Sequence, residues 1–183
     1  TSILSAGDVA GTKPGGAPYV MTGSPDGLGA FDNGDGTITV LVNHELGAAA
    51  GAVHADGATG SFVSRLVIDK ATLSVISASD ADSQMYLWNS ALNGGAGGYQ
   101  LSTTALARFC SADLAPASAY YNAATGLGTQ DRIFLDGEEN GAEGRAIAHI
   151  ATGADTGKAF ELPQLGNTSW ENLLANPYTG DRT

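Results

Sequence analysis

The hydrophobic positions of this chain fall in short runs that are separated by turns rich in glycine, aspartate and asparagine. Residues 37–43 are mostly β-branched, which favours a strand. They follow the apolar segment 29–31 across Asp-Asn-Gly-Asp-Gly at 32–36, a sequence typical of a hairpin turn. This pattern predicts a first antiparallel hairpin.

The same pattern recurs twice. Alternating residues 61–69 and the apolar run 73–78 predict a second hairpin, and residues 144–150 and 159–163 predict a third. Hairpins of similar design about eighty residues apart favour radial repetition of antiparallel blades over alternating strands and helices. We therefore expect an all-β fold, a partial β-propeller of several blades, with a β-sandwich as the alternative.

Residues 80–130 are less regular. Asn93 to Gly98 indicates a flexible loop, and the alanine content of residues 114–124 predicts one short helix. We expect this region to be a helix-containing insertion between blades. Residues 1–183 then form a single domain, an incomplete propeller that continues beyond the chain, because several four-stranded blades need more residues than this. The rest of its own propeller, or other chains, would complete it.

Charge narrows the classes of partner. The chain has 8 Lys+Arg against 19 Asp+Glu, a formal charge of -11, which opposes binding to nucleic-acid phosphates. This excess of carboxylates suits cation binding, although ordinary secreted proteins share it. No apolar run approaches the ~20 residues of a membrane span. Residues 1–4 lack the features of a signal peptide, so an exported protein would already have lost its signal.

Three acidic motifs stand where strands are expected to end. They are Asn43-His44-Glu45, Gly137-Glu138-Glu139 and Trp170-Glu171-Asn172. Carboxylates at strand ends can converge on one site, so the pattern predicts a site for a hard metal ion. A solvated strand end or a charged hairpin tip is the alternative at each position. Because strand side chains alternate in direction, only one of Glu138 and Glu139 should point at such a site.

The single cysteine, Cys110, excludes an intramolecular disulfide. A lone cysteine is most often a small buried apolar residue. As a thiolate it would prefer iron, zinc or copper to calcium. Other familiar motifs are absent: Asp32 to Gly36 lacks the spacing of a calcium-binding EF-hand loop, and no serine-hydrolase elbow, zinc-protease helix or C-x-x-C pair occurs.

Taken in order, five segments resemble the PhoX-type alkaline phosphatase family over most of the chain, from about residue 23 to the end. They are Pro25 to Phe31, the strand leading into Asn43-His44-Glu45, Arg108-Phe109-Cys110, Gly137-Glu138-Glu139 and Ser169-Trp170-Glu171-Asn172. Ser111-Ala112-Asp113 departs from the glycine-rich segment that follows the cysteine in that family, so the resemblance implies a divergent branch.

The resemblance implies a β-propeller with a central site of calcium and iron (Fe³⁺) ions bridged by oxygen, which hydrolyses phosphate esters without zinc, in a secreted or periplasmic protein. It implies that the metal ligands are Glu45, Glu138 or Glu139, Glu171 and, for iron, Cys110. Arg108 or Arg145 would contact the substrate phosphate, since a guanidinium matches phosphate oxygens. The alternative hypothesis is a non-catalytic extracellular calcium-binding propeller module, used for attachment or assembly.

Overall fold

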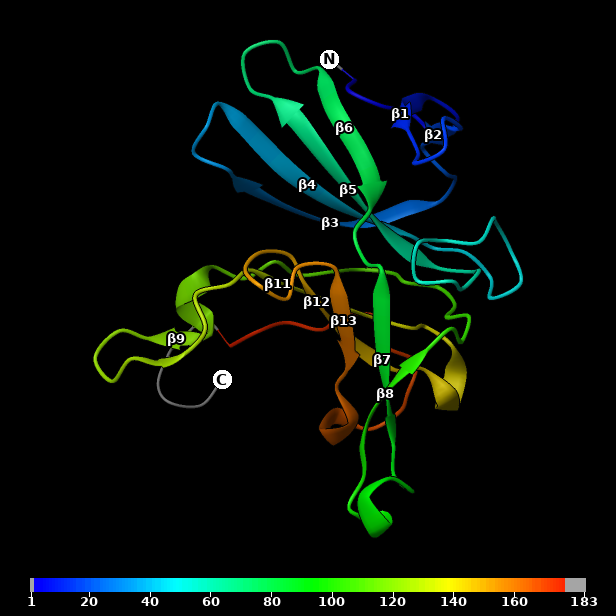
Figure 1. The fold of residues 1–183 in the computed structure, drawn as a ribbon, viewed down its shortest axis with the longest axis vertical. Coiled ribbons are helices and arrows are strands. Elements are labelled where there is room, and N and C mark those ends of the chain that lie inside the picture. The colour runs from blue at the N-terminus through cyan, green and yellow to red at the C-terminus, as the bar shows by residue number, and fades with distance from the viewer. Residues whose placement is uncertain (1, 177–183) are drawn as a thin grey trace.

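The computed structural model describes residues 2–176 and shows a mostly-β protein built from antiparallel and mixed sheets (Figure 1). The helical segments of these residues are single 3₁₀ turns: η1 (Asn93–Gly95), η2 (Ala117–Ala119), η3 (Gly141–Glu143) and η4 (Pro163–Leu165). None of the helices in this part of the chain is long and apolar enough to cross a membrane.

The first large sheet is an antiparallel meander. Its strands follow chain order: β3 (Pro25–Asp32), β4 (Thr37–His44), β5 (Phe62–Asp69) and β6 (Val75–Asp80). This confirms the first two predicted hairpins. A two-stranded ribbon of β1 (Val9–Thr12) and β2 (Pro18–Val20) lies beside it, where β1 contacts β6 (Figure 1).

The second large sheet is mixed. Its order is β11 (Ile133–Gly137), β12 (Ala146–Ile150), β13 (Lys158–Glu161), β7 (Gln84–Asn89) and β8 (Gly98–Ser102). The β12–β13 pair is the third predicted hairpin, which is confirmed. The β13–β7 pair is parallel and joins segments far apart in the chain, while the other neighbours in this sheet are antiparallel.

The expectation for residues 80–130 is wrong in two respects. Part of this region is not an insertion, because β7 and β8 belong to the second sheet, with the glycine-rich loop as their turn. The helix expected at 114–124 is also not formed: a single 3₁₀ turn, η2, leads into β9 (Tyr121–Asn122), which pairs with β10 (Leu127–Gly128). Isolated helices shorter than ~12 residues are only marginally stable, so this segment forms a short pair of strands instead.

One core joins the two large sheets. It contains Phe31, Leu41 and Val63 from the first sheet, and Met85, Phe134 and Ile147 are among those from the second. Leu106 and Phe109 complete it from a segment that bridges to Gly60 on one side and to Glu138 and Leu135 on the other. Residues 106–113, which we call the central segment, therefore lie between the sheets. Within residues 2–176, no strand ladder closes the sheets into a ring.

Candidate metal centre

Four segments distant in sequence meet at the central segment. Glu45 directly follows β4, Glu139 follows β11, and Glu171 lies in the loop after η4. The ligand atoms of Cys110, Glu139 and Glu171 all lie within 4.8 Å of one another, and those of Asp26, Glu45 and Cys110 do so as well. The two groups share Cys110, so its sulfur stands between two candidate metal positions.

Backbone and side-chain hydrogen bonds hold Cys110 in place. Its carbonyl oxygen accepts the Asn43 side-chain amide at 2.8 Å and the Gly27 backbone N–H at 3.1 Å. Its thiol donates to Glu139 Oε2 at 3.3 Å. Asn43 lies in β4 and Glu45 directly follows this strand, so the end of one strand both fixes the cysteine and supplies a carboxylate.

The surroundings of Cys110 favour a cation. Burial, the hydrogen bond to Glu139 and the negative charges of Glu45, Glu139 and Glu171 together raise the pKa of the thiol to about 12. With only these protein groups around it, the sulfur therefore keeps its proton at neutral pH. A bound cation reverses this, because it stabilises the thiolate and the carboxylates at once and releases the proton.

Arg108 spans the two groups. Its Nε donates to Glu45 Oε1 at 3.0 Å, and its Nη2 makes a close contact with Glu139 Oε2. Its backbone has φ of 54°, a left-handed conformation that costs a non-glycine residue of order 1–3 kcal/mol. The strand ends hold it there: its N–H donates to Leu46 O at 2.8 Å, and its carbonyl accepts Glu139 N–H at 2.9 Å.

Glu138 and Arg145 lie together on the other side of the β11 end. The buried Glu138 carboxylate accepts the Ala107 backbone N–H at 2.8 Å and Arg145 Nη1 at 3.2 Å. Burial raises the pKa of Glu138, although these contacts oppose the shift. Arg145 also approaches Glu161, at 3.8 Å. This arrangement ties the central segment to the second sheet, whereas Glu139 faces the shared cysteine.

Asp26 was not among the residues singled out as ligands from sequence. It lies at the exposed start of β3, outside the three acidic motifs, and reaches Cys110 only because β3 runs beside the central segment. Its place in the Pro25-Asp26-Gly27 segment is the one signal that sequence offers. That segment carries part of the family resemblance but marks no strand end.

A buried charge network lies deeper between the sheets. His149 Nδ1 contacts Asp82 Oδ2 at 2.6 Å, and its Nε2 contacts Asp136 Oδ1 at 2.9 Å. Burial by itself would lower the pKa of His149, but the charges of Asp136 and Asp82 and their hydrogen bonds raise it to about 10. Asp82 lies in the connection from β6 to β7, so the charged imidazole fastens that connection to the second sheet.

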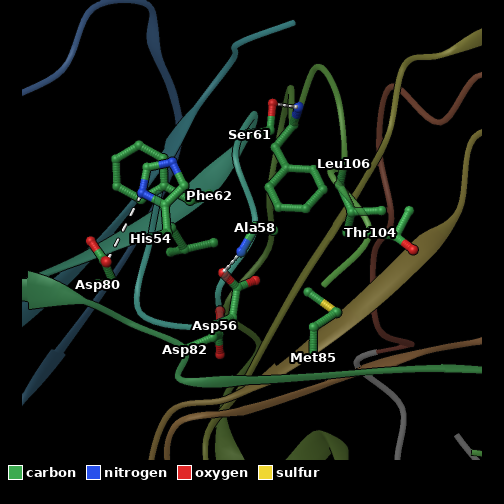
Figure 2. A pocket seen from close by; sticks show the side chains of 12 residues that line it. His54, Asp56, Ala58, Ser61, Phe62, Asp80, Asp82, Met85, Thr104 and Leu106 are labelled. Carbon is green, nitrogen blue, oxygen red and sulfur yellow. Dashed lines mark hydrogen bonds and ion pairs between the residues drawn. The ribbon is translucent and has the colours of Figure 1, made fainter. Parts of the chain in front are cut away.

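Figure 2 shows a small pocket next to this network, lined by carboxylates of Asp56, Asp80 and Asp82 and by His54. The volume open to the centre of a water molecule is about 10 Å³, about enough for one water. Among residues 2–176, neither Asp82 Oδ1 nor His54 Nδ1 has a hydrogen-bond partner there, although His54 Nδ1 lies 4.0 Å from Asp80 Oδ2. Among the described residues, two groups of three possible metal ligands lie around Cys110, and no such group lies in this pocket.

Comparisons with protein-family models, with curated proteins and with solved structures give no match for this chain.

Proposed function

We propose that this chain carries the metal centre of a phosphate-ester hydrolase of the PhoX type. The observation that carries the proposal is the convergence on Cys110 of carboxylates from four separate segments. Exposed acidic groups are common on proteins, but a purely structural module has no need to place two pairs of carboxylates around one buried thiol. The Arg108 guanidinium beside them supplies a group that matches phosphate oxygens.

The donor set fits the implied metals. Asp26, Glu45, Glu139 and Glu171 offer the hard oxygen ligands that calcium prefers, and Cys110 offers the softer sulfur that suits iron. These residues supply only part of the coordination that calcium takes, which leaves positions for water or substrate oxygens. Glu139 fits this role better than Glu138, whose carboxylate is occupied by Ala107 N–H and Arg145.

Metal ions at such a centre neutralise charge on the phosphate and activate the attacking oxygen. The protein's own residues position the groups around the metal ions. Asn43 and Gly27 fix the Cys110 carbonyl, and the two strand ends fix the backbone of Arg108, so the guanidinium stays tethered beside the cysteine. A guanidinium held beside the ester can bind its non-bridging oxygens through two parallel hydrogen bonds.

The fold proposed for the whole protein is a β-propeller. The β3–β6 meander has the strand order of one blade, and the inner strands β3 and β11 both face the central segment, as inner strands face a propeller axis. In that arrangement further blades, from the same protein or from other chains, would cover the remaining side of the centre. An exported protein also meets the calcium concentrations that weak oxygen sites need.

The deciding experiment is elemental analysis of the intact protein together with hydrolysis of a generic phosphomonoester, with and without a calcium chelator. We expect calcium plus iron, and turnover that the chelator abolishes. Cys110→Ser should lose iron, and Glu139→Gln should lower turnover by at least a hundredfold. Glu143→Gln is the matched control, because this exposed glutamate in η3 belongs to neither ligand group. Calcium alone without turnover would instead support the non-catalytic module.

A further inference from the structure

Arg108 holds one carboxylate from each ligand group. Glu45 belongs to the group with Asp26, Glu139 belongs to the group with Glu171, and the guanidinium contacts both at once. Each of these carboxylates would have to turn to a metal ion for its group to be complete. The arginine and the metals therefore compete for the same oxygens.

The guanidinium and a metal ion are both positively charged, so they compete directly for these carboxylates. Among the described residues, the salt bridges of Glu45 and Glu139 are those with Arg108. Two positive charges a few ångströms apart repel strongly at the edge of a protein, so a divalent ion cannot share these carboxylates with the guanidinium at low cost. Without a metal ion, the guanidinium balances the negative charges of Glu45 and Glu139.

The side chain can leave while the backbone stays. The Arg108 backbone is held by Leu46 O and Glu139 N–H, whereas its side chain is half exposed. When it is displaced, the guanidinium remains tethered beside the centre and its donors become free. An anion that approaches the loaded metals then finds those donors facing it.

We propose that Arg108 is a loading gate: its guanidinium must be displaced from Glu45 and Glu139 before the two metal positions fill, and it then serves as the receptor for the phosphate group. Because one guanidinium blocks both groups, the first metal to displace it makes the second position easier to fill. This adds a positive contribution to the coupling between the two positions, which opposes the repulsion between the two metal charges. This inference rests on the metal centre proposed above.

The test is calorimetric titration of the chelator-treated intact protein with calcium chloride, followed by titration of the calcium-loaded protein with inorganic phosphate. We expect Arg108→Ala to bind calcium at least tenfold more tightly than wild type and with this positive contribution to the coupling lost. The same variant should bind phosphate at least tenfold more weakly. If Arg108 had a merely structural role, its loss would weaken the binding of both calcium and phosphate. Tighter calcium binding together with weaker phosphate binding therefore identifies the gate.

Two further variants keep the test decisive. Lys70→Ala removes one positive charge from a different exposed pair, that with Asp32, and should leave calcium affinity within about twofold of wild type. Arg108→Lys keeps the charge but not the fork that holds two carboxylates, so it should bind calcium with intermediate affinity and reduced coupling, even if the alanine variant folds poorly.

Three results would overturn the inference. If Arg108→Ala binds calcium no more tightly than wild type, while Cys110→Ser weakens binding, the metal centre stands and the gate is wrong. If the tighter calcium binding comes with unchanged phosphate affinity, the receptor role is wrong. If neither wild type nor any Arg108 variant binds calcium, the proposed function fails and the gate with it.

Discussion

His149 shows how a single buried residue depends on its charged neighbours. The imidazole is almost fully buried and lies between Asp82 and Asp136, which come from two different parts of the chain. Burial also raises the pKa of Asp136, although the charge of His149 opposes this. The positive imidazole thus compensates the fully buried carboxylate of Asp136 and the largely buried carboxylate of Asp82. Removing one member of a buried ionic group leaves the others uncompensated.

We therefore predict that His149→Gln lowers the free energy of unfolding by about 3–5 kcal/mol at pH 7. The folded-state pKa of about 10 lies above the ordinary histidine value of 6.5. The stabilisation by His149 is therefore complete below pH 6.5 and is lost as pH rises through about 10. The cost of the substitution should be smaller at pH 10 than at pH 7, as measured by urea denaturation.

His44→Gln provides the control for this pH dependence. Burial lowers the pKa of His44, so its imidazole is neutral at both pH values and the cost of its substitution should not change between them. A His149→Gln cost that stays constant or grows toward pH 10 would show that the imidazole is not charged in the folded protein.

At the level of elements, the site depends on how closely β3 approaches the central segment. Gly27 lies in β3 and donates its N–H to Cys110 O. A side-chain Cβ at this position would lie 2.6 Å from Ala112 Cβ and 2.8 Å from Cys110 O. Such distances are too short for real contacts, so the central segment would have to move. The glycine is what lets the strand and the cysteine meet.

Gly27→Ala is therefore expected to cost about 1–3 kcal/mol of stability through overpacking. It should also weaken calcium binding at least fivefold, because it pushes Cys110 away from Asp26 and Glu45. Gly23→Ala is the matched control: its φ is not positive and, in the described part of the chain, no atom beyond its chain neighbours lies within 4 Å of the added Cβ, so it should change stability by less than about 0.5 kcal/mol. Wild-type calcium affinity in Gly27→Ala would contradict this account of the site.

For the whole molecule, the shared core decides whether the two sheets fold as one unit. Phe109 is almost fully buried and belongs to the core that contains residues of both sheets. It also makes an edge-on ring contact with His149, at 5.8 Å between centroids. The central segment thus carries the candidate metal ligand Cys110 and also the core residue Phe109, which packs between the sheets.

We predict that Phe109→Ala lowers the free energy of unfolding by about 3–5 kcal/mol and that both sheets still unfold in one transition. Tryptophan fluorescence reports the second sheet through Trp88, and hydrogen exchange of β4 and β5 amides reports the first. Leu127→Ala, at an exposed position of β10, is the control and should be close to neutral. Separate transitions for the two sheets would contradict a shared core.

Sequence by itself determined three hairpins of this protein, but not the local structure of residues 114–124, where the predicted helix is not formed. Each of the three predicted hairpins closes over a short turn, so its β-branched runs and its Asp, Asn and Gly residues contain the information needed. The alternation of side chains along a strand also predicts that Glu138 and Glu139 point in different directions, and in the structure Glu139 contacts Cys110 whereas Glu138 contacts Arg145. The acidic motifs also predicted that Glu45 and Glu138 lie at strand ends, and these residues directly follow β4 and β11.

Only the tertiary structure decided how these pieces meet. The parallel pairing of β7 with β13 joins residues some seventy positions apart, and no local pattern encodes it. The approach of Asp26 to Cys110, the bridge that Arg108 makes between Glu45 and Glu139, and the network around His149 all depend on the packing of two sheets around the central segment. Such contacts follow from the burial of a common core, which is a property of the whole chain rather than of any one segment.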